Sequence, residues 1–245
     1  MPGKAKGQHY RVTEEDPQAL GGKAIRKQVT IYFTADEAGP SMAVLLYLPK
    51  GQKGPVPVFA GLNFKGNHTI HPDPGIAVTT RWVGNDKSVN ITGNRSNEAA
   101  RGLQAGRWAV EEVIARGYGV ATAYYGDLEP DHPAGWQTGI RSQLQAALQT
   151  QPAEWGAIGA WAWGMSRMMD YLETDPAIRA QQVVLHGHSR IGKAALWAGA
   201  NDKRFAAIIS NESGEGGAAL ARESQGEHKK EKNKGKQLPH YGRLH

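Results

Sequence analysis

The residue of this chain whose setting most clearly suggests chemistry is a serine placed between glycines. Ser189 follows the apolar, β-branched run Val183–Leu185, which is typical of a buried strand, and it precedes the helix-forming residues Ala194–Ala200. Gly187 and Gly192 must then belong to the turn between strand and helix. Such a sharp turn exposes a serine hydroxyl, as in the G-x-S-x-G nucleophile elbow, although the second glycine comes one residue late here. We predict that Ser189 is a nucleophile.

A serine hydroxyl attacks an ester at neutral pH only if a base takes its proton and donors stabilise the resulting oxyanion. The backbone N–H of Arg190 starts the helix after the turn, where the helix dipole favours negative charge, and the Arg190 guanidinium offers a second donor. A plainer alternative is that Ser189 only caps the helix.

A carboxylate that could orient a base follows the next strand. Glu212 lies just after the apolar run Phe205–Ser210, so it reaches the same rim of a parallel sheet as Ser189. Glu215 is the second choice. Alternatively, Glu212 caps a turn.

The surrounding pattern predicts the elements that hold these residues. An antiparallel hairpin is followed by strands that alternate with helices, which is typical of the α/β-hydrolase fold, a three-layer sandwich with a mostly parallel sheet. We expect a polar, loosely ordered lead-in over 1–22, the α/β-hydrolase domain over 23–220 and a basic, disordered tail over 221–245. The expected strands are Ala24–Phe33, Met42–Leu48, Val56–Leu62, Gly119–Tyr125, Gln182–His186 and Phe205–Ser210. The expected helices are Asn97–Arg116, with a break at Gly102 or Gly106, Trp155–Leu172 and Ala194–Ala200, and residues Thr69–Arg95 are expected to form a long loop over one end of the sheet.

Composition excludes several classes of protein. The 245 residues include no cysteine, which rules out disulfides and thiol catalysis. Residues 222–245 carry a net charge of +4 out of the total of +6, which is typical of a solvated tail, so we expect no nucleic-acid partner. No apolar run is long enough to span a bilayer and residues 1–13 do not resemble a signal peptide, so we expect no membrane partner.

A polar loop, two histidines and two tryptophans are further candidates for binding roles. The loop 63–68 follows a strand and is a candidate for the second half of an anion hole. His68 and His71 lack a third ligand with suitable spacing, so we expect no metal site. Trp82 and Trp136, in expected loops, are candidates for stacking on sugar rings.

Several segments together carry a family resemblance. The run Gly187-His188-Ser189-Arg190-Ile191-Gly192-Lys193 is similar to the G-C-S-R-x-G-K motif of glucuronoyl esterases, carbohydrate esterase family 15, with histidine in place of the usual cysteine. Bacterial members are also similar at 61–69, 115–119, 155–158 and 211–218. The resemblance implies a serine hydrolase acting on glucuronic acid esters of lignin-carbohydrate complexes, with no cofactor. It also implies that Ser189 is the nucleophile, Arg190 an oxyanion stabiliser, Glu212 the triad acid and Lys193 a contact to the sugar.

One member of the triad has no clear counterpart in this sequence. The family places its base histidine well downstream of the nucleophile, and neither His228 nor His240 matches that position. We therefore expect a C-terminally truncated hydrolase, whose fold is incomplete at that end. Two alternatives to a glucuronoyl esterase stay open: another carbohydrate esterase, such as an acetyl xylan esterase, or an inactive chain that at most binds carbohydrate. The resemblance suggests a secreted or periplasmic location, and the oligomeric state is left open.

Overall fold

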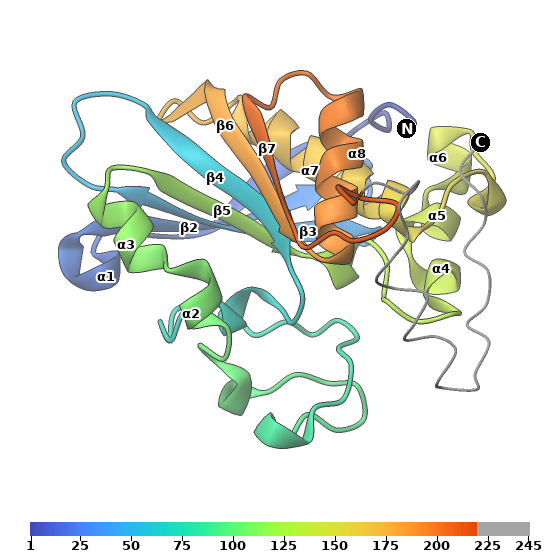
Figure 1. Ribbon diagram of the computed structural model, residues 1–245, viewed down its shortest axis with the longest axis horizontal. Helices are drawn as coiled ribbons and strands as arrows, with labels where there is room; N and C mark the ends of the chain where they lie inside the picture. Colours follow the sequence, from blue (N-terminus) through green and yellow to red (C-terminus); the bar gives the residue numbers. More distant parts are fainter. Residues whose placement is uncertain (220–245) are drawn as a thin grey trace.

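The computed structural model describes residues 1–219, in which seven strands form one sheet (Figure 1). The spatial order is β1-β2-β3-β5-β4-β6-β7. The first three strands and the β3–β5 pair are antiparallel, whereas β5, β4, β6 and β7 run parallel to one another. The strands are β1 (His9–Asp16), β2 (Ala24–Tyr32), β3 (Ser41–Pro49), β4 (Val56–Asn63), β5 (Gly119–Tyr124), β6 (Ile178–His188) and β7 (Ala207–Asn211).

The predicted hairpin and parallel strands are confirmed, with ends shifted by a few residues. β2 and β3 pair in register from Ala24 with Pro49 to Tyr32 with Ser41. The lead-in was predicted wrongly, because 9–16 is not loose: it forms β1, which pairs with β2 at the edge of the sheet. An edge strand has one face in water, so its side chains can be mostly polar. The polar sequence of this segment therefore did not exclude a strand. The segment predicted as a basic tail, 221–245, lies outside the described residues.

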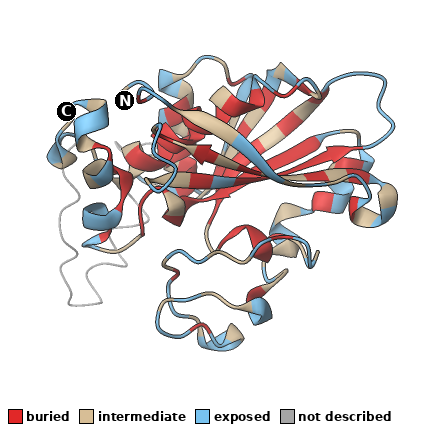
Figure 2. Cartoon of the chain, turned by 180° about the vertical axis from the view of Figure 1, so that it is seen from behind, coloured by how far each residue is buried: buried red, intermediate tan, exposed pale blue. Residues whose placement is uncertain are grey.

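Helices cover both faces of the sheet and complete three layers. α7 (Ala157–Leu172) and α8 (Arg190–Asn201) pack against each other and share one core with Val44, Leu46 and Leu48 of β3. The alternate residues Leu45 and Tyr47 point to the other face, into a smaller core with α3 (Val110–Ala115). This arrangement confirms the predicted mostly parallel α/β sandwich. The central strands β3, β4 and β5 are deeply buried, whereas the edge strands β1 and β7 are not (Figure 2).

The helix predicted over 97–116 is interrupted at Gly102 (φ 70°), one of the two breaks considered, and again at Ala109, which was not predicted. The chain instead forms a 3₁₀ turn at Glu98–Ala100, then α2 (Ala105–Trp108) and α3, which are separated by Ala109 in a left-handed conformation. Before them, the predicted long loop after β4 projects from one edge of the sheet (Figure 1). Four short helices had no counterpart in the prediction: α1 (Ala19–Gly22), α4 (Gly135–Thr138), α5 (Ile140–Gln143) and α6 (Gln145–Leu148).

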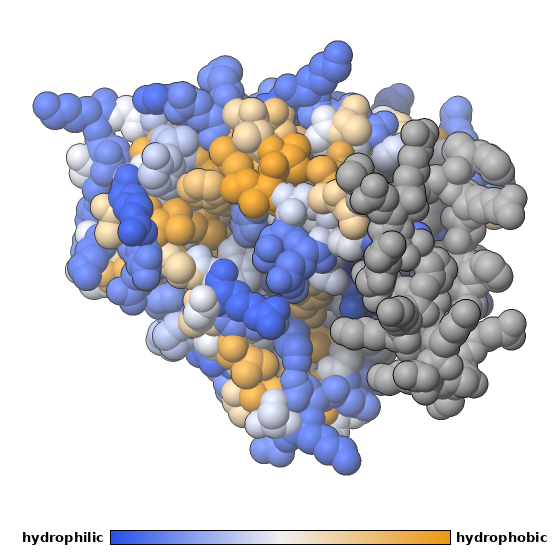
Figure 3. All heavy atoms as spheres, in the orientation of Figure 1, coloured by the Kyte–Doolittle hydropathy of each residue, from blue (hydrophilic) through white to orange (hydrophobic). Residues whose placement is uncertain are grey.

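The last described strand, β7, pairs only with β6 among the described residues. Ile209 of β7 is 48% exposed and Trp197 of α8 is 42% exposed. Hydrophobic side chains accordingly gather on the face of the molecule that carries β7 and α8 (Figure 3). None of the helices in residues 1–219 has the length and apolar character needed to cross a bilayer.

Candidate active site

Ser189 lies at the turn from β6 into α8, as the sequence predicts. Its backbone adopts φ 54° and ψ −130°, a sparsely populated conformation that costs on the order of 1–3 kcal/mol for a residue with a side chain. The Ser189 N–H donates to the carbonyl of Asn211 at the end of β7 (2.9 Å), and the N–H of Lys193 donates to the Ser189 carbonyl (3.2 Å). The Ser189 side chain makes no capping hydrogen bond to α8, which contradicts the alternative that it serves only as a helix cap.

The two glycines of the turn are required by close packing. A Cβ atom on Gly187 would press on the backbone of Ile191, the second residue of α8. A Cβ atom on Gly192 would lie 3.0 Å from Ser210 Oγ and 3.1 Å from the Cβ atom of Ser213. Gly192, which comes one residue later than in the usual pattern, therefore faces β7 and the turn after it. Ile191, at the usual glycine position, has a fully buried side chain.

The Arg190 guanidinium is held beside the elbow by two neighbours. Its Nη1 donates to the carboxylate of Asp131, in the loop after β5, and its Cζ lies 6.0 Å from the centre of the Phe64 ring. Guanidinium has five N–H donors, so a carboxylate that takes one or two leaves others to meet an oxyanion. Sequence analysis did not find Asp131, although its position after a parallel strand on the same rim was a usable signal.

The loop that carries Asp131 is firmly anchored. Glu129 and Arg141 form a two-pronged ion pair with both distances at 2.7 Å, and the Glu129 side chain is only 3% exposed. The indole N–H of Trp161 donates to the Glu129 carbonyl (3.0 Å). Asp131 is thus presented to Arg190 from a fixed support, and this limits the positions open to the guanidinium.

Glu212, the predicted acid, follows the strand that pairs with β6, but it makes no contact comparable to that of Arg190. His188 pairs with Asn211 across β6 and β7, so Glu212 directly follows the residue that binds the Ser189 N–H. Glu212 is exposed, has a left-handed backbone (φ 47°), and its carboxylate makes no hydrogen bond among the described residues. Lys193 is half-buried, one turn along α8 from Ser189. The second choice, Glu215, is also exposed.

No histidine within residues 1–219 hydrogen-bonds to Ser189 or Glu212. His188 Nδ1 lies 3.1 Å from the side-chain amide nitrogen of Asn211; because that amide donates, a neutral His188 carries its proton on Nε2 and offers no free lone pair there. His186 packs edge-on against Trp108, and burial lowers its pKa to about 4. His228 and His240 lie outside the described residues.

The loop 63–68 lies beside the elbow, since the ring of Phe64 is 6.4 Å from that of His188. The loop is fixed by Asn63, whose Oδ1 accepts from the Gly66 N–H (2.8 Å) and whose Nδ2 donates to Asn67 Oδ1 (2.7 Å). The Gly66 N–H is thereby used within the loop. Burial, with Arg101 nearby, lowers the pKa of His68 to about 4, so His68 is a neutral, packed residue.

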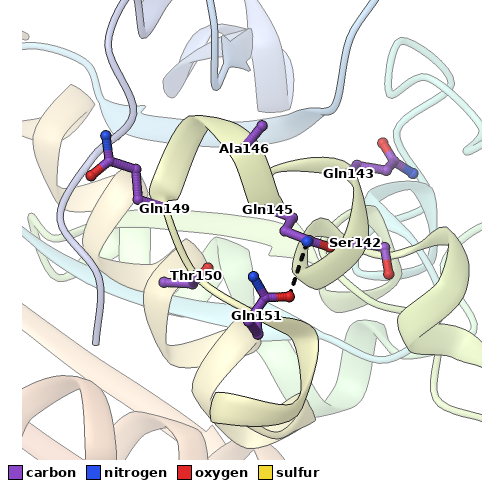
Figure 4. Close-up of a pocket in the computed structure, with 7 residues that line it drawn as sticks. All are labelled: Ser142, Gln143, Gln145, Ala146, Gln149, Thr150 and Gln151. Atoms are coloured by element: carbon purple, nitrogen blue, oxygen red, sulfur yellow. Dashed lines mark hydrogen bonds between the residues drawn. The ribbon is translucent and has the colours of Figure 1, made fainter.

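The two tryptophans considered for sugar stacking differ in exposure. Trp136 lies in α4 rather than in a loop and is 38% exposed, whereas Trp82 is half-buried, with its ring 4.8 Å from that of His132. In the described part of the chain, no three histidine or acidic side chains cluster closely enough to hold a metal ion. A hollow of about 540 Å³ at α5 and α6 is lined by polar side chains and includes none of the predicted site residues (Figure 4).

Comparisons with known proteins agree with this geometry. The family model described as "Glucuronyl esterase, fungi" matches residues 141–241. A carbohydrate esterase, MZ0003, from an unknown prokaryotic organism is 54% identical over 86% of this chain and 49% of its own length. A 4-O-methyl-glucuronoyl methylesterase from Cerrena unicolor is 38% identical over 64% of this chain and 37% of its own length.

The fold matches as well. The glucuronoyl esterase from Solibacter usitatus superposes with a TM-score of 0.82 at 49% identity, over 91% of this chain and 56% of that one. The chain thus spans about half the length of the relatives it matches, or less. Over that span the chain is similar in sequence and fold to glucuronoyl esterases and other carbohydrate esterases, and it has their α/β-hydrolase fold.

Proposed function

We propose that this chain carries the nucleophile side of a serine esterase that acts on esters of glucuronic acid. The observation that carries the proposal is Ser189 itself, held in a strained turn at the carboxyl end of a parallel strand, with its side chain not used as a helix cap. The relatives named as glucuronoyl esterases and 4-O-methyl-glucuronoyl methylesterases support the substrate class.

The reaction is acyl transfer in two steps. Ser189 Oγ attacks the carbonyl carbon of the uronate ester, and the negative charge passes to the carbonyl oxygen. In the second half of that step the C–O bond breaks, and the alcohol leaves with a proton. Water then attacks the acyl-serine, which releases the uronic acid and returns the proton to Ser189.

The positive side chains next to Ser189 suit this charge development. The Arg190 N–H, at the first turn of α8, and the Arg190 guanidinium stabilise the oxyanion. Lys193 contacts the sugar from the same helix. Glu212 orients the base that receives the Ser189 proton, and this base is a histidine outside the described residues.

The test is hydrolysis of benzyl glucuronate compared with p-nitrophenyl acetate. We expect release of benzyl alcohol by the wild-type chain and none by Ser189→Ala, while Ser142→Ala, at the hollow in α5 and α6, behaves as wild type. Preference for the acetate would favour the acetyl esterase alternative. Absence of hydrolysis of both esters, with the protein folded, would contradict an active esterase in this chain.

A further inference from the structure

A second polar pocket lies on the far side of β5 from the elbow. It has a volume of about 180 Å³ and is bounded by the outer faces of β2 and β3, by the turn after β5 and by residues 77–81. Thr30 of β2 is paired with Ala43 of β3, and both line its floor. The carboxyl end of β5 forms one wall, so the pocket opens on the rim of the sheet that also carries the elbow.

The segment over this pocket is fixed at both ends. Gln28 Oε1 accepts from the Ala77 N–H (2.8 Å), and Gln28 Nε2 donates to the Gly75 carbonyl (3.0 Å). At the other end the Tyr124 hydroxyl donates to the Trp82 carbonyl (2.7 Å). Because the clamps lie on either side of residues 78–81, the pocket between them is formed without a ligand.

The pocket holds one charged group of each sign. The Asp127 side chain is only 6% exposed, and its Oδ2 accepts from the Ala43 N–H (2.9 Å). Its Oδ1 is 3.9 Å from Arg81 Nε, which is beyond hydrogen-bond distance, so this oxygen keeps its capacity to accept. Arg81 Nη2 donates to Ser41 Oγ (3.3 Å), which holds the guanidinium at the pocket wall.

Burial raises the pKa of Asp127 to about 6, although the Ala43 N–H and the nearby Arg81 both favour the charged carboxylate. At neutral pH the group is still mostly ionised. A ligand that donates a hydrogen bond to Oδ1 would therefore satisfy an acceptor that the protein itself leaves open.

Size and charge narrow the class of ligand. A water molecule occupies about 30 Å³ in the liquid, so the pocket holds roughly six waters, about the space of one six-membered sugar ring. Neighbouring acceptor and donor groups match two adjacent hydroxyls, each of which both donates and accepts. Asp127 and Arg81 carry opposite charges, so a neutral sugar keeps the pocket balanced, whereas an anionic or a cationic sugar would add a net charge beside them.

We infer that this pocket binds one neutral pyranose unit through two adjacent hydroxyls, one donating to Asp127 Oδ1 and the other accepting from Arg81. Asp127 and Asp131 lie four residues apart in the segment after β5. The proposed sugar site and the residue that holds Arg190 are therefore carried by the same segment. Sugar binding here does not depend on the chemistry at Ser189.

The experiment is a calorimetric titration of the full chain with methyl β-D-xylopyranoside, a neutral pyranose with adjacent hydroxyls. Sodium methyl β-D-glucuronide, which adds a carboxylate to a pyranose ring, is the comparison ligand. We expect saturable binding of the xyloside and at least tenfold weaker binding of the glucuronide. The Arg81→Gln and Asp127→Asn variants should each bind the xyloside at least tenfold more weakly than wild type, which is about 1.4 kcal/mol.

Two further variants keep the test decisive. Glu112→Gln, at an exposed pair with Arg116 on α3, should bind the xyloside as wild type does. Ser189→Ala should also bind it unchanged, which separates this site from the elbow. Arg81 is nearly half exposed, so Arg81→Gln remains informative even if Asp127→Asn folds poorly. No saturable xyloside binding, unchanged affinity in Arg81→Gln, or equal affinity for the glucuronide would overturn the inference.

Discussion

Ser189 and Glu212, the proposed nucleophile and the proposed acid, directly follow adjacent strands of one sheet but are held in different ways. Around Ser189, a strained backbone, two close-packed glycines and the Asp131–Arg190 pair fix the geometry. Around Glu212, the carboxylate is exposed and no hydrogen bond within residues 1–219 orients it. The comparison indicates that contacts within residues 1–219 position Ser189, whereas those contacts do not orient the Glu212 carboxylate.

The largest expected effect is on the pH dependence of stability, because the region around Ser189 includes a half-buried histidine that packs against Trp108. His186, on β6 just before the elbow, has its pKa lowered from 6.5 to about 4 by burial. The folded state therefore binds fewer protons than the unfolded state between those values. The contribution of neutral His186 to the free energy of unfolding is therefore fully present above pH 6.5. It falls by roughly 3 kcal/mol as the pH drops to 4, at about 1.4 kcal/mol per pKa unit.

Urea unfolding at a series of pH values checks this prediction. His68 shifts in the same direction, so His186→Gln should remove only part of the slope between pH 4 and 6.5. A wild-type protein equally stable at pH 4.5 and pH 7 would show that His186 is not buried as described.

The next effect concerns the packing of the turn. In Gly187→Ala the added methyl group presses on the backbone of Ile191, which cannot move without shifting α8. We expect the free energy of unfolding to fall by roughly 2–3 kcal/mol, as for overpacked sites in general. Gly106→Ala on α2 is the matched control, since its Cβ atom would meet no other atom within 4 Å. Equal stability of the two variants would contradict the claim that close packing against Ile191 requires a glycine at position 187.

A smaller effect is expected from Asp131→Asn. Because Arg190 is half exposed, the ion pair should contribute less than about 1 kcal/mol to stability. The rate of ester hydrolysis should nevertheless fall about tenfold through kcat, with KM little changed, because the guanidinium is less well aligned with the oxyanion. Asp131→Glu should recover part of the rate. A loss of stability equal to the loss of rate would mean that Asp131 acts only on folding.

The smallest effect is expected at the proposed acid. Glu212→Gln should change the free energy of unfolding by less than about 0.5 kcal/mol, since the carboxylate is exposed and has no partner among the described residues. Thermal unfolding of the variant beside wild type measures this. A loss above about 2 kcal/mol would show a buried, paired Glu212 and would erase the contrast with Ser189.

The sequence predicted those features that short segments determine. The run 183–192 contains the strand, both glycines and the serine, so the turn at Ser189 followed from local pattern. The break at Ala109 did not, because alanine favours helix. Ala109 itself is exposed, and its left-handed conformation comes just before Val110, which is buried in the core under α3. The polar strand β1 was missed because an edge strand buries little of its surface.

The contacts around the site depend on residues distant in sequence. Asp131 meets Arg190 across 59 positions, and Asp127 meets Ala43 across 84. No periodicity encodes such pairs, and they became visible only once the order of strands was known. The proposed roles of Ser189, Arg190, Glu212 and Lys193 remain predictions for experiment.

The central claim is that Ser189 is an activated nucleophile, and a fluorophosphonate probe tests it most directly. After incubation, digestion and mass spectrometry, the account predicts a single phosphonate adduct on the peptide that contains Ser189, absent in Ser189→Ala and retained in Ser142→Ala. An unlabelled but folded wild-type protein, or an adduct on another serine that persists in Ser189→Ala, would contradict it.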